Sequence, residues 1–238
     1  MGKIKQLDSV TINKIAAGEV IDRPVSIVKE LLENSFDAGS TKITISVEEG
    51  GKKSIIISDN GSGIIKEDLL VAPLRHSTSK ITKLEDLYLT NSFGFRGEAL
   101  CSICHAAQVS ITSNNRNESY QIHCHQANIS KPEPKTHNPG TTIMVRELFQ
   151  NMPVRQKFLK TTNTELSYIT DIVQQFALIH PHIDFTLTHN EKEILNTTNI
   201  KELKCIIALI YGKNFINNLI EINHQQGDVN FYGYLTDP

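Results

Sequence analysis

The segment Pro24-Val-Ser-Ile-Val-Lys-Glu-Leu-Leu-Glu-Asn-Ser-Phe-Asp-Ala-Gly39 is the most informative part of the sequence about the fold. Pro24 suits the first position of a helix, where its missing N–H leaves no hydrogen bond unmade. Apolar residues then recur at helical spacing, and Gly39 is typical of a position just past a helix end. The apolar positions are Val25, Val28, Leu31, Leu32 and Phe36. We therefore predict an amphipathic helix between Pro24 and Gly39.

Two strands and a glycine-rich loop follow this helix. Residues 42–48 alternate polar and apolar side chains, which is typical of a half-buried strand, and Glu49-Gly-Gly-Lys52 has the composition of a turn. Ser54-Ile-Ile-Ile-Ser58 predicts a short buried strand that ends at Asp59-Asn-Gly-Ser-Gly63. The local order is therefore helix, hairpin and glycine loop.

The other elements place the chain in the α/β class. We predict strands over residues 109–113, 120–125, 142–146, 184–188 and about 227–234, with helices over about 98–107 and 166–179. Between Ile64 and about Thr90 we predict a helix, a polar stretch over residues 76–80 and a second short helix. This order favours an α+β sandwich in which helices cover one face of a mixed β-sheet. A new helix and two strands begin after about residue 200, so we divide the chain at 1–200 and 201–238.

Composition and charge exclude several classes of protein. The chain has 238 residues, 24 Lys+Arg against 26 Asp+Glu, and 39% hydrophobic residues, which argues against disorder and against a strongly basic nucleic-acid binder. Any DNA contact must come from a local patch such as the basic stretch 153–160, although a solvated helix start is the simpler interpretation. No apolar run approaches the roughly 18 residues of a membrane span. The start has no signal-peptide pattern, and the four Cys are not spaced as a disulfide framework, so we expect a soluble intracellular protein.

The helix of residues 24–38 carries two candidate functional side chains. Glu30 and Asn34 are four residues apart and therefore share one face. A solvated polar face explains this spacing. Alternatively, the carboxylate could orient a water molecule and the amide oxygen could bind Mg²⁺, which prefers oxygen ligands and substrate phosphates.

Two glycine-rich segments could contact a nucleotide. Residues 59–63 form an ordinary turn signal, or else Asp59 could accept a hydrogen bond from an amine such as that of adenine. Residues 93–100 read Phe-Gly-Phe-Arg-Gly-Glu-Ala-Leu and open a helix, whose N-terminal N–H groups could bind phosphate. A plain helix entry remains the alternative for the second segment, and a loop for the polar stretch 76–80.

The cysteines and histidines match other patterns. Cys101-Ser-Ile-Cys104-His105 matches the string for haem attachment and a zinc half-site, and His123-Cys-His125 could be its other half. In a strand the two His side chains face one way and Cys124 the other. We therefore favour packing over a metal or haem site.

The order of the motifs resembles the N-terminal ATPase region of the MutL family of DNA mismatch-repair proteins, which belongs to the GHKL (Bergerat-type) ATPase class. The matching strings are Ile15-Ala-Ala-Gly-Glu-Val-Ile-Asp-Arg-Pro24, Val28-Lys-Glu-Leu-Leu-Glu-Asn-Ser-Phe-Asp-Ala-Gly39, Asp59-Asn-Gly-Ser-Gly63, Arg75-His-Ser-Thr-Ser-Lys80, Gly94-Phe-Arg-Gly-Glu-Ala-Leu100 and Gly140-Thr-Thr142. The resemblance runs from about residue 4 to the end.

The resemblance implies a role for each matching residue. Glu30 corresponds to the general base that activates water, Asn34 to the Mg²⁺ ligand, and Asp59 to the carboxylate that recognises adenine. Thr141 corresponds to the hydroxyl near adenine in preference to Thr142. The residues implied to bind the nucleotide are Asn34, Asp59, Gly63, Thr78, Ser79, Lys80, Gly94, Phe95, Arg96, Gly97, Glu98, Ala99, Leu100 and Thr141.

The resemblance also implies a function. ATP and Mg²⁺ would drive a conformational switch in which two chains dimerise through their N-terminal regions, and the partners would be a MutS-type mismatch-recognition protein and DNA bound weakly without sequence specificity. No membrane partner is expected, and the location would be cytoplasmic in a bacterium or nuclear in a eukaryote. Residues 201–238 would begin a second domain similar to a ribosomal-protein fold, whose lysine reaches the γ-phosphate in the family and lies beyond this chain. We therefore expect slow hydrolysis, and the alternative is a non-hydrolysing, ATP-gated scaffold.

Overall fold

The computed structural model describes residues 21–79, 97–126, 128–227 and 229–236. The short helix predicted before Thr90 lies outside these residues. Within them, no helix is both long and apolar enough to cross a membrane.

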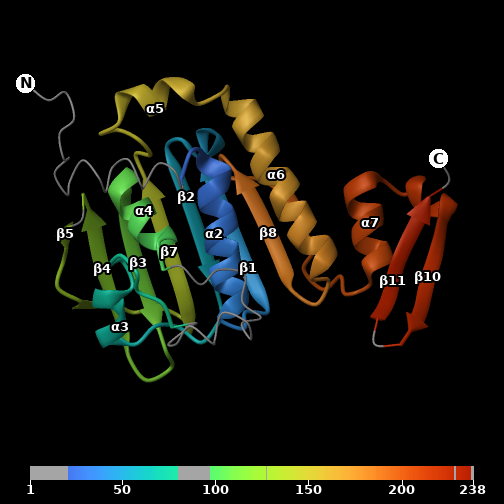
Figure 1. The fold of residues 1–238 in the computed structure, drawn as a ribbon, viewed down its shortest axis with the longest axis horizontal. Coiled ribbons are helices and arrows are strands. Elements are labelled where there is room, and N and C mark those ends of the chain that lie inside the picture. The colour runs from blue at the N-terminus through green and yellow to red at the C-terminus, as the bar shows by residue number, and fades with distance from the viewer. Residues whose placement is uncertain (1–20, 80–96, 127, 228, 237–238) are drawn as a thin grey trace, which may run out of the picture.

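The centre of the structure is one nine-stranded mixed sheet (Figure 1). Its strand order is β5-β4-β3-β7-β2-β1-β8-β9, with β6 paired to β4. Strands β1 and β8 run parallel, whereas the other described pairs are antiparallel. The bounds are β1 Lys42–Glu48, β2 Ser54–Asp59, β3 Gln108–Asn114, β4 Ser119–His125, β5 Asn128–Ile129, β6 Glu133–Pro134, β7 Gly140–Arg146, β8 Asp184–His189 and β9 Lys192–Asn196.

Helices α2, α4 and α6 cover one face of this sheet (Figure 1). The helix bounds are α2 Pro24–Asp37, α3 Lys66–Val71, α4 Ala99–Ala106, α5 Pro153–Phe158, α6 Thr162–Ile179 and α7 Leu203–Tyr211, with 3-10 turns η1 Glu49–Gly51 and η3 Phe215–Asn218. The predicted fold class, a mixed sheet with helices on one face, is confirmed.

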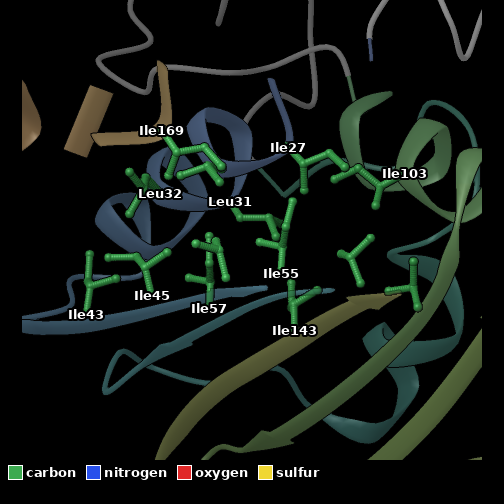
Figure 2. Close-up of a cluster of buried hydrophobic side chains, with 14 of the residues drawn as sticks. Ile27, Leu31, Leu32, Ile43, Ile45, Ile55, Ile57, Ile103, Ile143 and Ile169 are labelled. Carbon is green, nitrogen blue, oxygen red and sulfur yellow. The ribbon is translucent and has the colours of Figure 1, made fainter. Parts of the chain in front are cut away.

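The core lies between α2 and the strands beneath it. In Figure 2, Ile27 and Leu31 of α2 lie over Ile55 of β2, and all three side chains are fully buried. Ile103 of α4 and Ile169 of α6 close the same layer from the two sides. The apolar stripe of α2 therefore fixes which side of the helix faces the sheet, and Glu30 and Asn34 remain partly exposed.

Several predicted boundaries shift by one or two residues. Strand β2 extends one residue further, to Asp59, and β7 begins at Gly140, so Thr141 lies inside a strand. Short strands β5, β6 and β9 are additional to the prediction.

The last part of the chain forms a separate sheet. Strand β10, Leu219–Gln226, pairs with β11, Val229–Thr236, in an antiparallel hairpin that follows α7 and η3. The predicted helix and two strands after residue 200 are therefore present. The division into domains 1–200 and 201–238 stays a prediction.

Candidate functional site

Glu30 and Asn34 lie one turn apart on α2, and both are partly exposed. The neighbouring acid Glu33 is buried and forms an ion pair with Lys29, with 3.8 Å between Lys29 Nζ and Glu33 Oε1. The carboxylates of Glu30 and Glu33 therefore differ in their exposure to solvent. Glu33 has a cationic partner on its own helix, whereas Glu30 is partly exposed.

Asp59 is the junction of three elements. Its Oδ2 accepts a hydrogen bond from Ser35 Oγ of α2 at 3.2 Å, and its Oδ1 accepts from the backbone N–H groups of Gly61 at 2.8 Å and Thr141 at 3.3 Å. Burial raises the pKa of the Asp59 carboxyl, although these hydrogen bonds act in the opposite direction. The Asp59 carboxyl is therefore held in a poorly hydrated place, where one more hydrogen-bond donor to its ionised form would be favourable.

The backbone around Asp59 is too close for side chains. Gly140 has φ +119°, and a Cβ there would lie 2.0 Å from the Asp59 carbonyl oxygen. Gly63 has φ +72°, and its Cβ would lie 2.3 Å from the Asn114 carbonyl oxygen. The glycine loop after β2 is thus packed directly against the ends of β3 and β7.

Thr141 and Thr142 point to opposite faces of β7. Thr141 is 7% exposed, and its Oγ1 lies 2.8 Å from Ser113 Oγ, which also accepts from the backbone N–H of Ile64 at 2.8 Å. Thr142 Oγ1 instead lies 2.7 Å from both Ser58 Oγ and His137 Nε2. Only the first of the two threonines therefore belongs to the Asp59 side of the sheet.

A second group of contacts joins the start of α4 to the chain before residue 78. The backbone N–H of His76 donates to the Gly97 carbonyl at 3.0 Å. Glu98 Oε1 lies 3.6 Å from Arg75 Nε and 3.6 Å from His76 Nδ1. Thr78 and Ser79 follow directly, and Ala99 and Leu100 form the first positions of α4.

The site residues expected from the sequence thus fall into three sets. Asp59, Gly63 and Thr141 gather at the ends of β2 and β7, whereas Gly97 and Glu98 contact residues 75–77. Glu30 and Asn34 lie on α2, the helix that also supplies Ser35 to Asp59. Thr78 and Ser79 follow the residues that contact Glu98, and Ala99 and Leu100 begin α4. The other four expected residues, Lys80, Gly94, Phe95 and Arg96, lie outside the described residues.

Sequence reasoning missed Ser35, Ser113 and the side chains of Arg75 and His76. The hydroxyl of Ser35 also lies 3.0 Å from the Leu31 carbonyl, which is the ordinary bond of a helical serine and carries no signal of the second partner. Ser113 comes from a strand far along the chain. Arg75 and His76 belong to the motif of residues 75–80, but their contacts with Glu98 depend on the fold.

Cys101, Cys104 and Cys124 are buried, which agrees with the predicted packing role, whereas Cys205 is exposed. Cys104 and Cys124 are each 1% exposed, while the flanking His123 and His125 are exposed on the other side of β4. A side-chain hydrogen bond with Cys124 and burial both raise the pKa of the Cys104 thiol. Among the described residues, no three His, Cys, Asp or Glu side chains are grouped so as to hold a metal ion.

Comparison with known proteins identifies relatives of this chain. Residues 23–153 match the family model described as "Histidine kinase-, DNA gyrase B-, and HSP90-like ATPase". The DNA mismatch repair protein MutL of Lactococcus lactis subsp. cremoris (strain SK11) is 45% identical over 240 residues, which cover 100% of this chain and 37% of that protein. MutL of Clostridium botulinum (strain Eklund 17B / Type B) is 45% identical over 237 residues, or 99% of this chain and 35% of that protein.

Solved structures show the same relationship. The Aquifex aeolicus MutL ATPase domain complexed with ADP matches with a TM-score of 0.67 and 30% identity, over 86% of this chain and 73% of that one. The N-terminal domain of a DNA repair protein matches with a TM-score of 0.81 and 30% identity, over 97% of this chain and 74% of that one. The chain spans little more than a third of the length of the two curated relatives, at 37% and 35%. The resemblance predicted from the motifs is confirmed, and the chain belongs to the MutL family of DNA mismatch-repair proteins, whose histidine kinase-, DNA gyrase B- and HSP90-like ATPase domain it contains.

Proposed function

We propose that this chain binds ATP with Mg²⁺, hydrolyses it slowly and serves as the ATP-driven conformational and dimerisation switch of a mismatch-repair protein. The observation that carries the proposal is Asp59, a partly desolvated carboxylate held by Ser35, Gly61 and Thr141 where α2, β2 and β7 meet. The likeness to a solved MutL ATPase domain that is complexed with ADP supports a nucleotide ligand for this chain.

Asp59 would recognise the adenine base. Each carboxylate oxygen can accept more than one hydrogen bond, so lone pairs remain after the bonds from Ser35, Gly61 and Thr141. The 6-amino group of adenine is a donor and satisfies such an acceptor, whereas the 6-oxo group of guanine does not. Site residues Gly63 and Thr141 border this position and would limit the space around the base.

The phosphates would lie between α2 and the start of α4. Gly97, Glu98, Ala99 and Leu100 lead into the N-terminus of α4, where unpaired N–H groups and the helix dipole favour anions. Thr78 and Ser79 would add hydroxyl donors, and Lys80, Gly94, Phe95 and Arg96 complete the proposed set.

Asn34 fits the usual coordination of Mg²⁺. Its partly exposed amide offers one oxygen ligand, and Mg²⁺ commonly takes one or two protein oxygens and completes its shell with phosphates and water. When bound, Mg²⁺ neutralises part of the phosphate charge.

Glu30 would act as the general base. Its carboxylate lies one turn before Asn34 on the same partly exposed side of α2, so it could orient a water molecule toward the γ-phosphate. The water oxygen forms a bond to the γ-phosphorus while the bond to the bridging oxygen of ADP breaks, and Glu30 takes the proton. The products are ADP and phosphate.

The partners and location belong to the same proposal. We infer that nucleotide binding promotes a homodimer through the N-terminal region, contact with a MutS-type protein and weak, sequence-independent contact with DNA. Two relatives are bacterial DNA mismatch repair proteins, and we infer a cytoplasmic location for this chain as well. The near balance of 24 Lys+Arg and 26 Asp+Glu agrees with weak DNA binding.

The test compares binding and turnover in one set of proteins. Calorimetric titration of ATP with Mg²⁺ should give saturable binding to the wild-type chain and to Glu30→Gln, and phosphate release should fall only in the variant. Glu67→Gln, an exposed acid of α3, is the matched control and should behave as wild type. Absence of ATP binding to the wild type at millimolar nucleotide would contradict the proposal. Binding without measurable turnover in the wild type would instead favour the ATP-gated scaffold.

A further inference from the structure

Arg75, His76 and Glu98 form a polar cluster, here called the clasp, at the start of α4. It joins two parts of the chain that are about twenty residues apart in sequence. Arg75 Nε and His76 Nδ1 each lie 3.6 Å from the same oxygen, Glu98 Oε1. The Glu98 side chain is 28% exposed and that of Arg75 is 38% exposed, so the pair is only partly hydrated.

The backbone at Gly97 packs closely against the backbone of residues 76 and 77. A Cβ at Gly97, which has φ +61°, would lie 2.5 Å from the Ser77 carbonyl oxygen, so only glycine allows this approach. The His76 N–H donates to the Gly97 carbonyl at 3.0 Å, and His76 itself has φ +62°. A non-glycine residue in the left-handed region is held there by its surroundings.

Glu98 also stands at the start of a helix. Its carbonyl accepts the first α4 hydrogen bond, from Ser102 N at 2.9 Å, while its carboxylate makes no capping bond to α4 and turns to Arg75 and His76. A carboxylate at a proposed phosphate-binding helix end would repel the phosphates if its charge were uncompensated. The Arg75 guanidinium removes that repulsion.

We propose that Arg75 and Glu98 are positioning residues for the nucleotide phosphates, with Arg75 neutralising Glu98 while the pair fixes the backbone of Gly97 at the start of α4. The inference rests on the proposed nucleotide site. The proposal goes beyond that site because Arg75 and Glu98 would tune how strongly the α4 N-terminus binds phosphate although their side chains need not touch the nucleotide.

The charge argument makes a prediction that a purely structural role does not. Arg75→Gln leaves the Glu98 charge unbalanced, so the loss of affinity should grow with the number of phosphates on the ligand. We expect about tenfold weaker binding of ATP, a smaller loss for ADP, and less than about threefold for adenosine. Adding Glu98→Gln removes the unbalanced charge, so the double variant should bind ATP more tightly than Arg75→Gln alone.

The experiment is a calorimetric titration of adenosine, ADP and ATP into wild type, Arg75→Gln, Arg75→Lys, Glu98→Gln and the double variant. Arg75→Lys should stay near wild type because it keeps the charge, and Lys192→Gln, an exposed cation of β9, is the matched control. Thermal unfolding of each variant, measured without nucleotide, separates lost folding from lost affinity. Equal losses for all three ligands, or a double variant weaker than Arg75→Gln, would overturn the proposal. If the wild type binds none of the three ligands, the nucleotide site itself is wrong.

Discussion

Replacing Asp59 by asparagine should weaken adenine recognition without harming the fold. The amide oxygen of the new side chain would keep the bonds from Gly61 N and Thr141 N, which are 2.8 Å and 3.3 Å long in the wild type. The amide nitrogen would replace Oδ2 and donate to Ser35 Oγ, whose own proton can go to the Leu31 carbonyl at 3.0 Å. Each of these internal hydrogen bonds can thus be kept in Asp59→Asn.

The magnitudes follow from the charge and the direction of the hydrogen bond. Burial raises the pKa of Asp59, so its ionised form destabilises the fold at neutral pH, and the neutral variant should unfold at an equal or higher temperature. A hydrogen bond to a charged acceptor contributes about 1.5–3 kcal/mol, so loss of the acceptor should weaken ATP binding about 10- to 150-fold. The new amide donor suits the 6-oxo group of guanine, so the preference for ATP over GTP should shrink by a similar factor.

The assay is calorimetric titration of ATP and GTP into wild type and Asp59→Asn, with thermal unfolding by circular dichroism. Asp68→Asn, which changes an exposed acid in the first turn of α3, is the matched control and should leave both affinities unchanged. Two results would refute the reasoning: ATP binding to Asp59→Asn that equals the wild type, or a marked fall in its unfolding temperature at neutral pH.

Three further predictions concern the same site. Glu30→Gln should lower kcat about 10²- to 10⁴-fold while the Kd for ATP stays within about threefold, and a rapid phosphate-release assay that shows unchanged turnover would exclude Glu30 as the base. Gly140→Ala should lower the free energy of unfolding by about 3–5 kcal/mol, because its Cβ would lie 2.0 Å from the Asp59 carbonyl oxygen. Gly39→Ala, where φ is +70° and no atom lies within 4 Å of the new Cβ, should lower it by only about 1 kcal/mol. Urea denaturation of both variants measures the difference, and equal losses would count against the close contact at Gly140. ATP affinity should fall as the pH drops through the pKa of Asp59, which burial raises, and titrations across this range should show no such fall in the already neutral Asp59→Asn.

Local sequence patterns predicted the elements that carry the site. Helix α2 was predicted between Pro24 and Gly39 and spans Pro24–Asp37, because its apolar stripe and its terminal residues all favour the same element. The strand before Asp59 was predicted in the same way. These elements depend on near neighbours in the chain, so their residues alone determine them.

Contacts between distant residues were beyond such patterns. The parallel pairing of β1 with β8 joins residues about 140 apart in sequence, and β7 lies between β2 and β3 although it follows both. No local periodicity specifies which strands become neighbours, because pairing is decided by packing across the whole sheet.

The family, the helix that carries Glu30 and Asn34, and the choice of Asp59 as a candidate acceptor could all be predicted from the residues, because motifs and periodicity are local properties of the chain. The contacts of Ser35 and Thr141 with the Asp59 carboxylate, and of Arg75 and His76 with Glu98, are visible only in the folded molecule. These groups lie far apart along the chain or depend on side-chain direction, and the folding of the sheet and its covering helices brings them within a few ångströms of one another.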